Sequence, residues 1–510
     1  MAALQPDQTV GVIGAGTMGA GIAQIAAAAG HPVLLFDVRA DAAADAVNRI
    51  DQALRRLVSK GQLAEAERLA LIGRITPAQT LTALAPAALV IEAVVEDLET
   101  KRRVFTELEA VVSPSAILAS NTSSLSITAI GSGLNHAERL VGMHFFNPVP
   151  LMPLVEIVSG LATSAEVAGT AFLTAEAWGK TPAHTKSTPG FIVNRVARPF
   201  YGEALRVLQE GGGDIATLDA IMREAGGFRM GPFELMDMIG HDVNFEVTRS
   251  VYNAFFHDPR FTPSLIQQEL LTAGALGRKS GRGFYDYGEG ANRPAPSTAP
   301  AAPLPQRVTV HGQGGPLAAL LPLLKEVPHL TLERGNDGAA ETWFALDGRV
   351  AVALTDGRTA TQRTVAAGGL PFVLVDLALD HAKAPRVAVA NADQTPPDER
   401  NGTAIGLFQA IGKAVSILDD VPGLLVMRTV CMLINVAADA VYEGVCSADA
   451  VDTAMQGGVN YPLGPVAWAQ RLGIGRVVTV LDNLGQTYGE DRYRVSPLLR
   501  RRLFAGSDRL

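Results

Sequence analysis

A glycine-rich segment near the N-terminus constrains the fold of this chain more than any other feature of the sequence. Val10–Ile13 is a short apolar run, Gly14-Ala15-Gly16-Thr17-Met18-Gly19 follows it, and Ala20–Ala29 has the composition of a helix. Val33–Phe36 is a second apolar run, and it ends at Asp37. This order predicts a strand, a glycine turn, a helix and a second strand, as in the first βαβ unit of a dinucleotide-binding domain.

The residues of the turn have separate physical roles. Gly14 permits the tight turn, Gly16 lets the backbone approach a pyrophosphate, and Gly19 lets helix and strand pack closely. Thr17 and Met18 lie in the turn just before the predicted helix, and the N–H groups at the start of that helix favour an anion. We therefore predict that all five residues bind the cofactor. The alternative is a glycine turn that only packs a helix on a sheet.

Asp37 ends the second strand, where a carboxylate accepts hydrogen bonds from the hydroxyls of the adenosine ribose. It would repel a 2′-phosphate, which favours NAD over NADP, but the nearby Arg39 keeps NADP open. A kinase-type glycine loop is disfavoured because a strand should follow its glycines, and here an Ala-rich helix follows.

Length and charge restrict the class of protein. A chain of 510 residues predicts two to four domains. Its net charge of −8 gives no general attraction to nucleic acid or to an anionic membrane. Residues 8–36 carry no charge, but their glycines and Pro32 interrupt any membrane helix. Cys431 and Cys446 form neither a disulfide framework nor a metal cluster. We expect a cytoplasmic protein with no secretory signal, membrane span or metal site.

Further apolar runs predict the rest of the N-terminal sheet. Leu89–Ala93, Ile117–Ala119 and Leu140–His144 read as strands, and charged helical stretches such as Asp97–Val112 separate them. This alternation is typical of a doubly wound α/β sheet. Because ligands gather at the carboxyl ends of such strands, polar residues there are site candidates.

Glu96, Ser123 and His144 follow strand ends in this prediction. An imidazole can take the proton of a hydroxyl while the carbon beneath it gives hydride to nicotinamide. Glu156 could hold the ring of His144 in one tautomer, and Ser123 and Asn194 could hydrogen-bond substrate oxygens. Each has a plainer alternative: a core histidine, an ion-pair partner or a helix cap.

The segments GAGTMGAGIAQ, SNTSS, GMHFFNPVP, LVEIV, TPGFIVNR and GPFELMD resemble the 3-hydroxyacyl-CoA dehydrogenase family of fatty-acid β-oxidation. The resemblance covers about residues 8–287. It implies that His144 is the catalytic base, that Glu156 is its partner, and that Ser123 and Asn194 orient the substrate. All four positions match the family pattern.

The resemblance also implies an acyl-CoA thioester substrate and NAD as cofactor. It places Glu96 and Lys101 near the nicotinamide ribose, and Lys60 near coenzyme A phosphates. A solvated helical lysine is the alternative reading of Lys60. In the family the helical domain closes over the thioester and carries the dimer contact, which implies a homodimer or a higher homo-oligomer.

The C-terminal half repeats part of the N-terminal half with a constant offset of 233 residues. Pro189-Gly190 recurs as Pro422-Gly423, and Gly231-Pro232 recurs as Gly464-Pro465. The copy has lost polar residues, because Met427 aligns with Asn194 and Val389 aligns with Glu156. We read residues 307–420 as a shortened, non-binding α/β domain whose role is packing and assembly.

These features predict a Rossmann-type NAD domain, an all-α domain, and a degenerate second copy of both. We expect an NAD-binding domain at residues 1–188 and a helical substrate and dimerisation domain at residues 189–290. A Pro/Ala-rich linker at residues 291–306 follows. The second copy has a degenerate α/β domain at residues 307–420 and a second helical domain at residues 421–510.

Relatives of this length with a duplicated helical domain resemble bacterial enzymes of phenylacetate breakdown, which oxidise 3-hydroxyadipyl-CoA. The segment FRMGPFELMD, which contains Arg229, looks most like that group. Arg229 or Arg198 could pair with the terminal carboxylate of such a substrate. The alternatives are a 3-hydroxybutyryl-CoA dehydrogenase, another NAD enzyme for β-hydroxy acids, and a non-catalytic protein that binds NAD or acyl-CoA.

Overall fold

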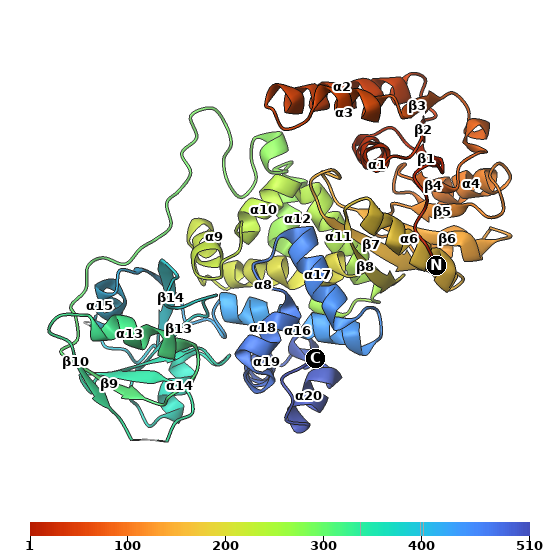
Figure 1. The fold of residues 1–510 in the computed structure, drawn as a ribbon. Helices are drawn as coiled ribbons and strands as arrows, with labels where there is room; N and C mark the ends of the chain where they lie inside the picture. Colours follow the sequence, from red (N-terminus) through yellow and green to blue (C-terminus); the bar gives the residue numbers. More distant parts are fainter. Residues whose placement is uncertain (337, 398, 401) are drawn as a thin grey trace. The chain divides into compact units, whose positions relative to one another are not determined.

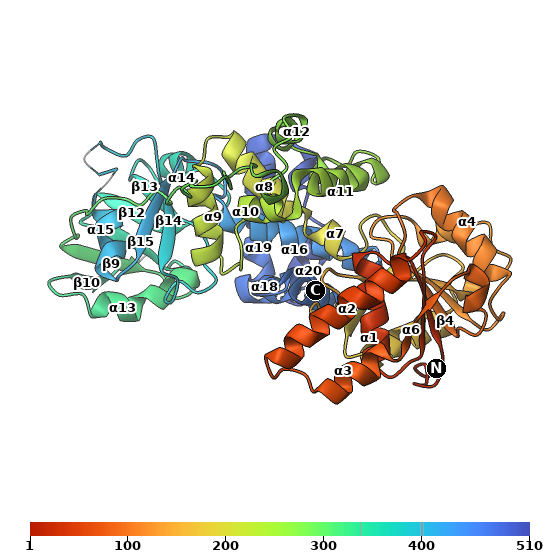
Figure 2. The same cartoon turned by 90° about the horizontal axis from the view of Figure 1, so that it is seen from above.

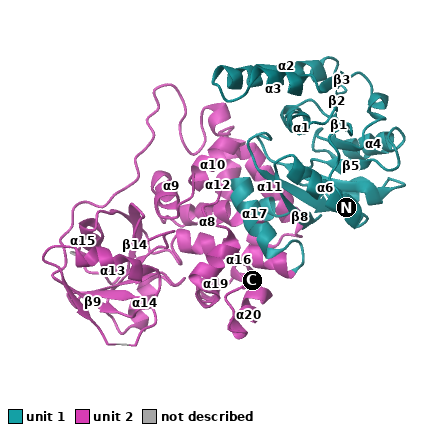
Figure 3. Cartoon of the chain, viewed as in Figure 1, with its two compact units in different colours: residues 1–195, 443–459 teal, residues 196–442, 460–510 magenta. Residues whose placement is uncertain are grey.

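The computed structural model of the chain describes residues 1–336, 338–397, 399–400 and 402–510. The chain divides into two compact units (Figure 3): residues 1–195 with 443–459, and residues 196–442 with 460–510. Each unit contains its own β-sheet. The first unit therefore includes a short segment from the C-terminal half of the sequence.

The sheet of the first unit has eight strands in the order β3-β2-β1-β4-β5-β6-β7-β8 (Figure 1). All neighbours are parallel except β6 and β7, which are antiparallel. The strands are β1 (Val10–Ile13), β2 (Val33–Phe36), β3 (Ile75–Ala78), β4 (Leu89–Glu92), β5 (Ile117–Ser120), β6 (Leu140–Phe145), β7 (Leu154–Ser159) and β8 (Thr181–Lys186).

Two apolar clusters cover the two faces of this sheet. Leu89 and Ile91 of β4 belong to one cluster, while Val90 between them belongs to the other. The helices are α1 (Thr17–Ala28), α2 (Ala42–Ser59), α3 (Glu65–Ile72), α4 (Leu98–Glu109), α5 (Ile127–Gly131), α6 (Ala165–Ala177), α7 (Val193–Val196) and α17 (Ala448–Val459). Burial on both faces confirms the doubly wound α/β class.

The predicted βαβ unit is confirmed, with one shift. Strands β1 and β2 have the predicted bounds, but α1 begins at Thr17 rather than at Ala20. The helix therefore starts inside the glycine turn, and Gly16 is its N-terminal cap residue. His144 also differs slightly from expectation, because it lies within β6 rather than after it.

The second unit is helical at its centre. Helix α8 packs against α16, and α16 in turn contacts α18, α19 and α20. The helices outside the second sheet are α8 (Arg198–Gln209), α9 (Ile215–Glu224), α10 (Pro232–Ile239), α11 (His241–Ala254), α12 (Leu265–Thr272), α16 (Val426–Tyr442), α18 (Pro465–Leu472), α19 (Ile474–Tyr488) and α20 (Pro497–Phe504).

Residues 291–306 contain neither helix nor strand and lead to the second sheet. This sheet has the order β10-β9-β11-β12-β13-β14-β15 (Figure 2). Its strands are β9 (Arg307–His311), β10 (Thr331–Arg334), β11 (Trp343–Leu346), β12 (Val350–Leu354), β13 (Phe372–Val375), β14 (Arg386–Asn391) and β15 (Ala414–Leu418), and its helices are α13 (Leu321–Lys325), α14 (Ala360–Ala366) and α15 (Thr403–Ala410).

The backbone keeps the internal repeat. Helices α10 and α18 begin and end at positions that differ by the same offset of 233. Gly190 and its counterpart Gly423 have φ angles of 74° and 72°, and Phe191 and Leu424 after them have φ angles of 48° and 53°. A positive φ is unusual for a non-glycine residue, so this shared turn is a strong structural signature of duplication.

Candidate active site

The glycine turn of the first unit has the shape that a dinucleotide needs. A methyl group on Gly14 would lie 2.5 Å from the carbonyl oxygen of Ala93, and one on Gly19 would overlap the carbonyl oxygen of Gly14. A methyl group on Gly16 would have no protein atom within 4 Å. Gly14 and Gly19 are thus required for packing within the protein. Gly16 instead faces open space at the start of α1. This helix has no side-chain cap, so its first N–H groups favour an anion.

Asp37 lies at the end of β2 and is tied to the same turn. Its Oδ2 accepts a hydrogen bond from the N–H of Ala15 at 2.8 Å, and its Oδ1 accepts from Arg39 Nε at 3.2 Å. Burial alone would raise the pKa of Asp37, but the N–H groups of Ala15 and Arg39 and the Arg39 guanidinium outweigh it and lower that pKa. The carboxylate is therefore ionised and ready to accept hydrogen bonds.

His144 and Glu156 face each other across two antiparallel strands. They are direct partners in the register of β6 and β7, and His144 Nδ1 lies 2.6 Å from Glu156 Oε2. Glu156 is completely buried and His144 is 6 % exposed. The ring of His144 lies against Phe146 and Phe191, with centroids 4.5 and 5.9 Å apart. Among the described residues, none hydrogen-bonds His144 Nε2.

The second oxygen of Glu156 is also held. Its Oε1 accepts hydrogen bonds from the N–H groups of Ile192 and Val193, each at 2.9 Å. These groups follow the turn at Gly190 and Phe191, so the turn presents two donors to the carboxylate. Glu156 is fixed in position by backbone on one side and orients the imidazole on the other.

Ser123 and Asn194 also meet in the first unit. The side-chain Nδ2 of Asn194 donates to the backbone carbonyl of Ser123 at 3.2 Å. The hydroxyl of Ser123 donates to Glu96 Oε1 at 3.2 Å. The structure thus brings the predicted Ser123, Asn194 and Glu96 together, with contacts among themselves that a ligand would share or replace.

Glu92, which binds Lys101 next to Glu96, was missed in the sequence analysis. Lys101 Nζ lies 2.6 Å from Glu92 Oε1 and 3.4 Å from Glu96 Oε2. Glu92 is completely buried, Lys101 is 1 % exposed, and Ser120 Oγ donates to Glu92 at 2.6 Å. The signal was available, because a glutamate inside the apolar strand Leu89-Val90-Ile91-Glu92 needs a partner.

Glu96 is held as an anion by this network. Burial would raise its pKa, but the ammonium of Lys101 and donors from Thr122, Ser123 and Ser124 outweigh burial and lower that pKa. Lys101 therefore acts on its surroundings through Glu96, because its own ammonium is enclosed by two carboxylates.

The remaining predicted ligands lie on exposed positions. Lys60 is exposed at the C-terminal end of α2, and Arg229 is exposed in the second unit. Neither forms an ion pair with another described residue. Both are thus available to a ligand, and no ion pair within the described ranges orients them.

The second sheet has valines in place of the histidine and glutamate pair, while the turn is kept. Val375 and Val389 are cross-strand partners in β13 and β14, at the positions that His144 and Glu156 occupy in the first sheet. Asp376 supplies a carboxylate instead, and it accepts hydrogen bonds from the N–H groups of Leu425, Val426 and Met427 at 2.9, 2.7 and 2.9 Å. A carboxylate thus still binds the backbone of the turn there, but valine stands at the position of His144.

Comparisons with known proteins give consistent findings for both halves of the chain. The NAD binding domain of 3-hydroxyacyl-CoA dehydrogenase matches residues 9–188, and the C-terminal domain of that family matches both 190–287 and 423–508. The 3-hydroxybutyryl-CoA dehydrogenase reduced Rossmann-fold domain matches residues 352–422. These matches confirm the NAD-binding domain, the helical domain and the duplicated arrangement expected from the sequence.

Individual relatives agree with the family models. The 3-hydroxyadipyl-CoA dehydrogenase of Escherichia coli K12 is 44% identical over 97% of both chains. A probable 3-hydroxybutyryl-CoA dehydrogenase of Bacillus subtilis is 42% identical, over 54% of this chain and 96% of its own. A crystal structure described as 3-hydroxybutyryl-CoA dehydrogenase from Escherichia coli K12 covers 98% of this chain and 99% of its own, with a TM-score of 0.89 and 44% identity.

Two further properties concern the described residues only. None of their helices combines the length and apolar content needed to cross a membrane. No group of three or more His, Cys, Asp or Glu side chains among them gathers in a way that could hold a metal ion.

Proposed function

This chain belongs to the 3-hydroxyacyl-CoA dehydrogenase family, and we propose that it oxidises 3-hydroxyadipyl-CoA to the 3-oxo thioester, with His144 as the base. It is an NAD-dependent oxidoreductase. The observation that carries the proposed role of His144 is the 2.6 Å contact between Nδ1 of this ring and the completely buried Glu156. This contact leaves Nε2 as the nitrogen that faces a substrate hydroxyl.

The proposed chemistry divides the two hydrogens of an alcohol. NAD, when bound, accepts the hydride from the carbon that bears the hydroxyl. His144 Nε2 takes the hydroxyl proton, and the Nδ1–H of the resulting imidazolium donates to Glu156 Oε2. Because Glu156 also accepts from two backbone N–H groups, it stays in place and stabilises the positive charge without moving.

Ser123 and Asn194 are proposed to orient the thioester. The Asn194 amide binds the backbone carbonyl of Ser123, and both the Ser123 hydroxyl and this amide can donate hydrogen bonds to oxygen. In this role they bind the reacting hydroxyl and the thioester carbonyl of the substrate. The proposed cofactor site consists of Gly14, Gly16, Thr17, Met18, Gly19, Asp37, Glu96 and Lys101. Lys101 acts there through Glu96. Lys60 is proposed to meet coenzyme A phosphates.

The identity of the acyl group rests on two considerations. The full-length relatives are named for two different substrates, a 3-hydroxyadipyl and a 3-hydroxybutyryl thioester. The first ends in a carboxylate, and Arg229 is exposed with no ion-pair partner among the described residues. We assign Arg229 to that carboxylate, which favours the adipyl substrate. Assembly as a homodimer or larger homo-oligomer in the cytoplasm is part of the same proposal.

The test measures NADH formation with 3-hydroxyadipyl-CoA and with 3-hydroxybutyryl-CoA, for the wild type and the His144→Gln variant. We expect turnover with the adipyl thioester and a loss of about a hundred- to ten-thousand-fold in His144→Gln. His136→Gln is the matched control, because His136 is a surface histidine whose ring pairs with Glu138. If neither thioester reacts while NAD still binds, the chain is a binding protein instead.

A further inference from the structure

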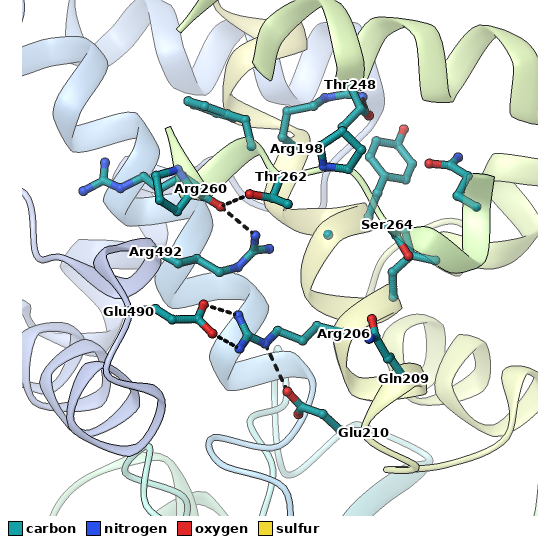
Figure 4. Close-up of a pocket in the computed structure, with 17 residues that line it drawn as sticks. Arg198, Arg206, Gln209, Glu210, Thr248, Arg260, Thr262, Ser264, Glu490 and Arg492 are labelled. Carbon is teal, nitrogen blue, oxygen red and sulfur yellow. Dashed lines mark hydrogen bonds and ion pairs between the residues drawn. The ribbon is translucent and has the colours of Figure 1, made fainter. Parts of the chain in front are cut away.

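The second unit contains a cavity of about 440 Å³ that is lined by none of the residues proposed for catalysis. It is lined by α8, α11, the turn η3 (Pro259–Phe261), the start of α12 and residues 490 and 492 (Figure 4). Its volume is in the range of sites for small molecules. The residues proposed for catalysis all lie in the first unit.

Four arginines line this cavity, and three of them are neutralised. Arg206 forms ion pairs with Glu210 and Glu490. Arg260 pairs with Asp439, and Arg492 pairs with Glu203. The Arg206 pairs are seen in the lower part of Figure 4. Arg198 differs, because it pairs with no carboxylate among the described residues.

Arg198 carries an uncompensated charge in a buried position. It is 6 % exposed, and its Nε has no hydrogen-bond partner. Its Nη1 donates to Thr248 Oγ1 at 3.0 Å, and its guanidinium lies 5.0 Å from the ring centre of Tyr201. Burial lowers the pKa of Arg198, and only tyrosines oppose this effect. Burying a charge without a counterion is costly, so an anion in the cavity would be strongly favoured.

A second feature of the cavity also favours an anion. Pro263 and Ser264 line it, and Ser264 is the N-terminal cap residue of the eight-residue helix α12. The hydroxyl of Ser264 is buried and has no partner, and the first turn of α12 carries no acidic residue. The first N–H groups of the helix are thus left without a side-chain cap, and helix N-termini bind oxyanions.

We propose that this cavity binds the phosphate group of a small molecule between Arg198 and the N-terminus of α12. The Arg198 guanidinium, the Ser264 hydroxyl and the first N–H groups of α12 offer more donors than the two oxygens of a carboxylate can use. A phosphate has three acceptor oxygens for them. The cavity is larger than a free phosphate ion, so the ligand is a phosphate ester.

Thermal unfolding of the full chain in inorganic phosphate tests the proposal, against sodium chloride of equal ionic strength. We expect phosphate to raise the Tm of the wild type by about 2 °C or more. Ser264→Asp places a carboxylate at a favoured N-cap position in the cavity that Arg198 also lines. This variant should have a higher Tm without phosphate and should no longer respond to phosphate.

Arg198→Gln should also lose the response, whereas Arg249→Gln should keep it. Arg249 lies on the same helix as Thr248, but it is exposed and paired with Glu246. An equal phosphate response in the wild type, Ser264→Asp and Arg198→Gln would place binding elsewhere and overturn the proposal. So would a wild type that responds to adipate and not to phosphate, or one that responds to no phosphate compound.

A second arm separates two sources of the phosphate, the coenzyme A portion of the substrate and a separate ester. Adenosine 3′,5′-bisphosphate replaces inorganic phosphate, and Ser264→Asp is assayed with the CoA thioester and with the shorter pantetheine thioester. A rise in KM confined to the CoA thioester assigns the site to the substrate. Unchanged KM values, with the phosphate response lost, assign it to a separate ester.

Discussion

Arg195 forms an ion pair with Glu443, a residue 248 positions later in the chain, with Nη2 and Oε2 2.8 Å apart. The repeat contains the reciprocal pair, because Arg428 binds Glu210 at 3.0 Å. In the sequence, Arg428 is the counterpart of Arg195 and Glu443 is the counterpart of Glu210. The same contact thus occurs once in each compact unit, with the roles of the two copies exchanged.

The Arg195 pair ties a segment of the second repeat to the proposed active site. Helix α17, which follows Glu443, packs on β7 and β8, and β7 carries Glu156. Arg195 is 3 % exposed, so removal of Glu443 leaves its buried guanidinium without that carboxylate. We expect Glu443→Ala to reduce stability by about 1–3 kcal/mol and to lower kcat.

Urea unfolding and steady-state kinetics check this expectation. Glu107→Ala is the control, since Glu107 is an exposed glutamate of α4. Equal stability and equal kcat in the Glu443 and Glu107 variants would show that the pair contributes nothing.

The βαβ unit and its cofactor could be predicted because their signals are local. Three glycines at fixed spacing, an apolar run on each side and a terminal aspartate specify a turn without knowledge of the rest of the chain. The contact between His144 and Glu156 has no such signal. It depends on the antiparallel register of β6 and β7, so the chemistry of the two residues offered it as one alternative and the family resemblance favoured it.

The remaining features that could not be predicted from the sequence depend on contacts between residues far apart in the chain. Asp376 replaces the structural role of Glu156 from a different strand, so aligning the repeats located Val389 but not the substitute. Arg195 and Glu443 are likewise paired by the way the repeats associate, which no local pattern encodes.

The buried pair of Lys101 and Glu92 predicts a strong asymmetry between single and double variants. Lys101→Met leaves Glu92 buried as an unpaired carboxylate, which should cost about 3–5 kcal/mol. Adding Glu92→Gln removes the charge but keeps an oxygen for Ser120, so the double variant should recover much of this loss. Chemical unfolding of the wild type and the two variants measures it, and a double variant as unstable as Lys101→Met would contradict it.

Glu203 predicts a specific sensitivity to acid. It is completely buried and binds Arg492 at 2.7 Å and Arg428 at 2.8 Å. Burial would raise its pKa, but the two guanidinium groups outweigh burial and lower that pKa to about 2. Its pKa in the unfolded chain is about 4.3. The carboxylate therefore stabilises the fold fully above that value, and the contribution is lost as the pH falls towards 2.

Glu203→Gln should be less stable than the wild type near neutral pH, by about 3–5 kcal/mol, because two buried arginines lose their anion. The difference should shrink as the pH falls from about 5 to about 2. Urea midpoints across this range test the sign, with Glu246→Gln as an exposed control. A difference that stays constant with pH would contradict the assignment.

Arg229 predicts a change in selectivity rather than in chemistry. If it binds the terminal carboxylate, Arg229→Gln should raise KM for 3-hydroxyadipyl-CoA by about ten-fold or more and leave 3-hydroxybutyryl-CoA unaffected. Because Arg229 is exposed, stability should not change. An equal change in KM for both thioesters would show that Arg229 does not bind the terminal carboxylate.

Gly16 predicts that folding and cofactor binding can be separated by one methyl group. Its φ of −69° suits alanine, and the added carbon would meet no protein atom within 4 Å, so Gly16→Ala should fold with normal stability. The methyl group would occupy the space into which a pyrophosphate must fit, which should weaken NAD binding by about ten-fold or more. Gly19→Ala is the contrasting variant, because its methyl group would overlap the carbonyl of Gly14 and should destabilise the domain. Calorimetric titration with NAD and thermal unfolding, applied to both variants, distinguish the effects. Normal NAD affinity in a folded Gly16→Ala protein would mean that the cofactor does not approach this turn.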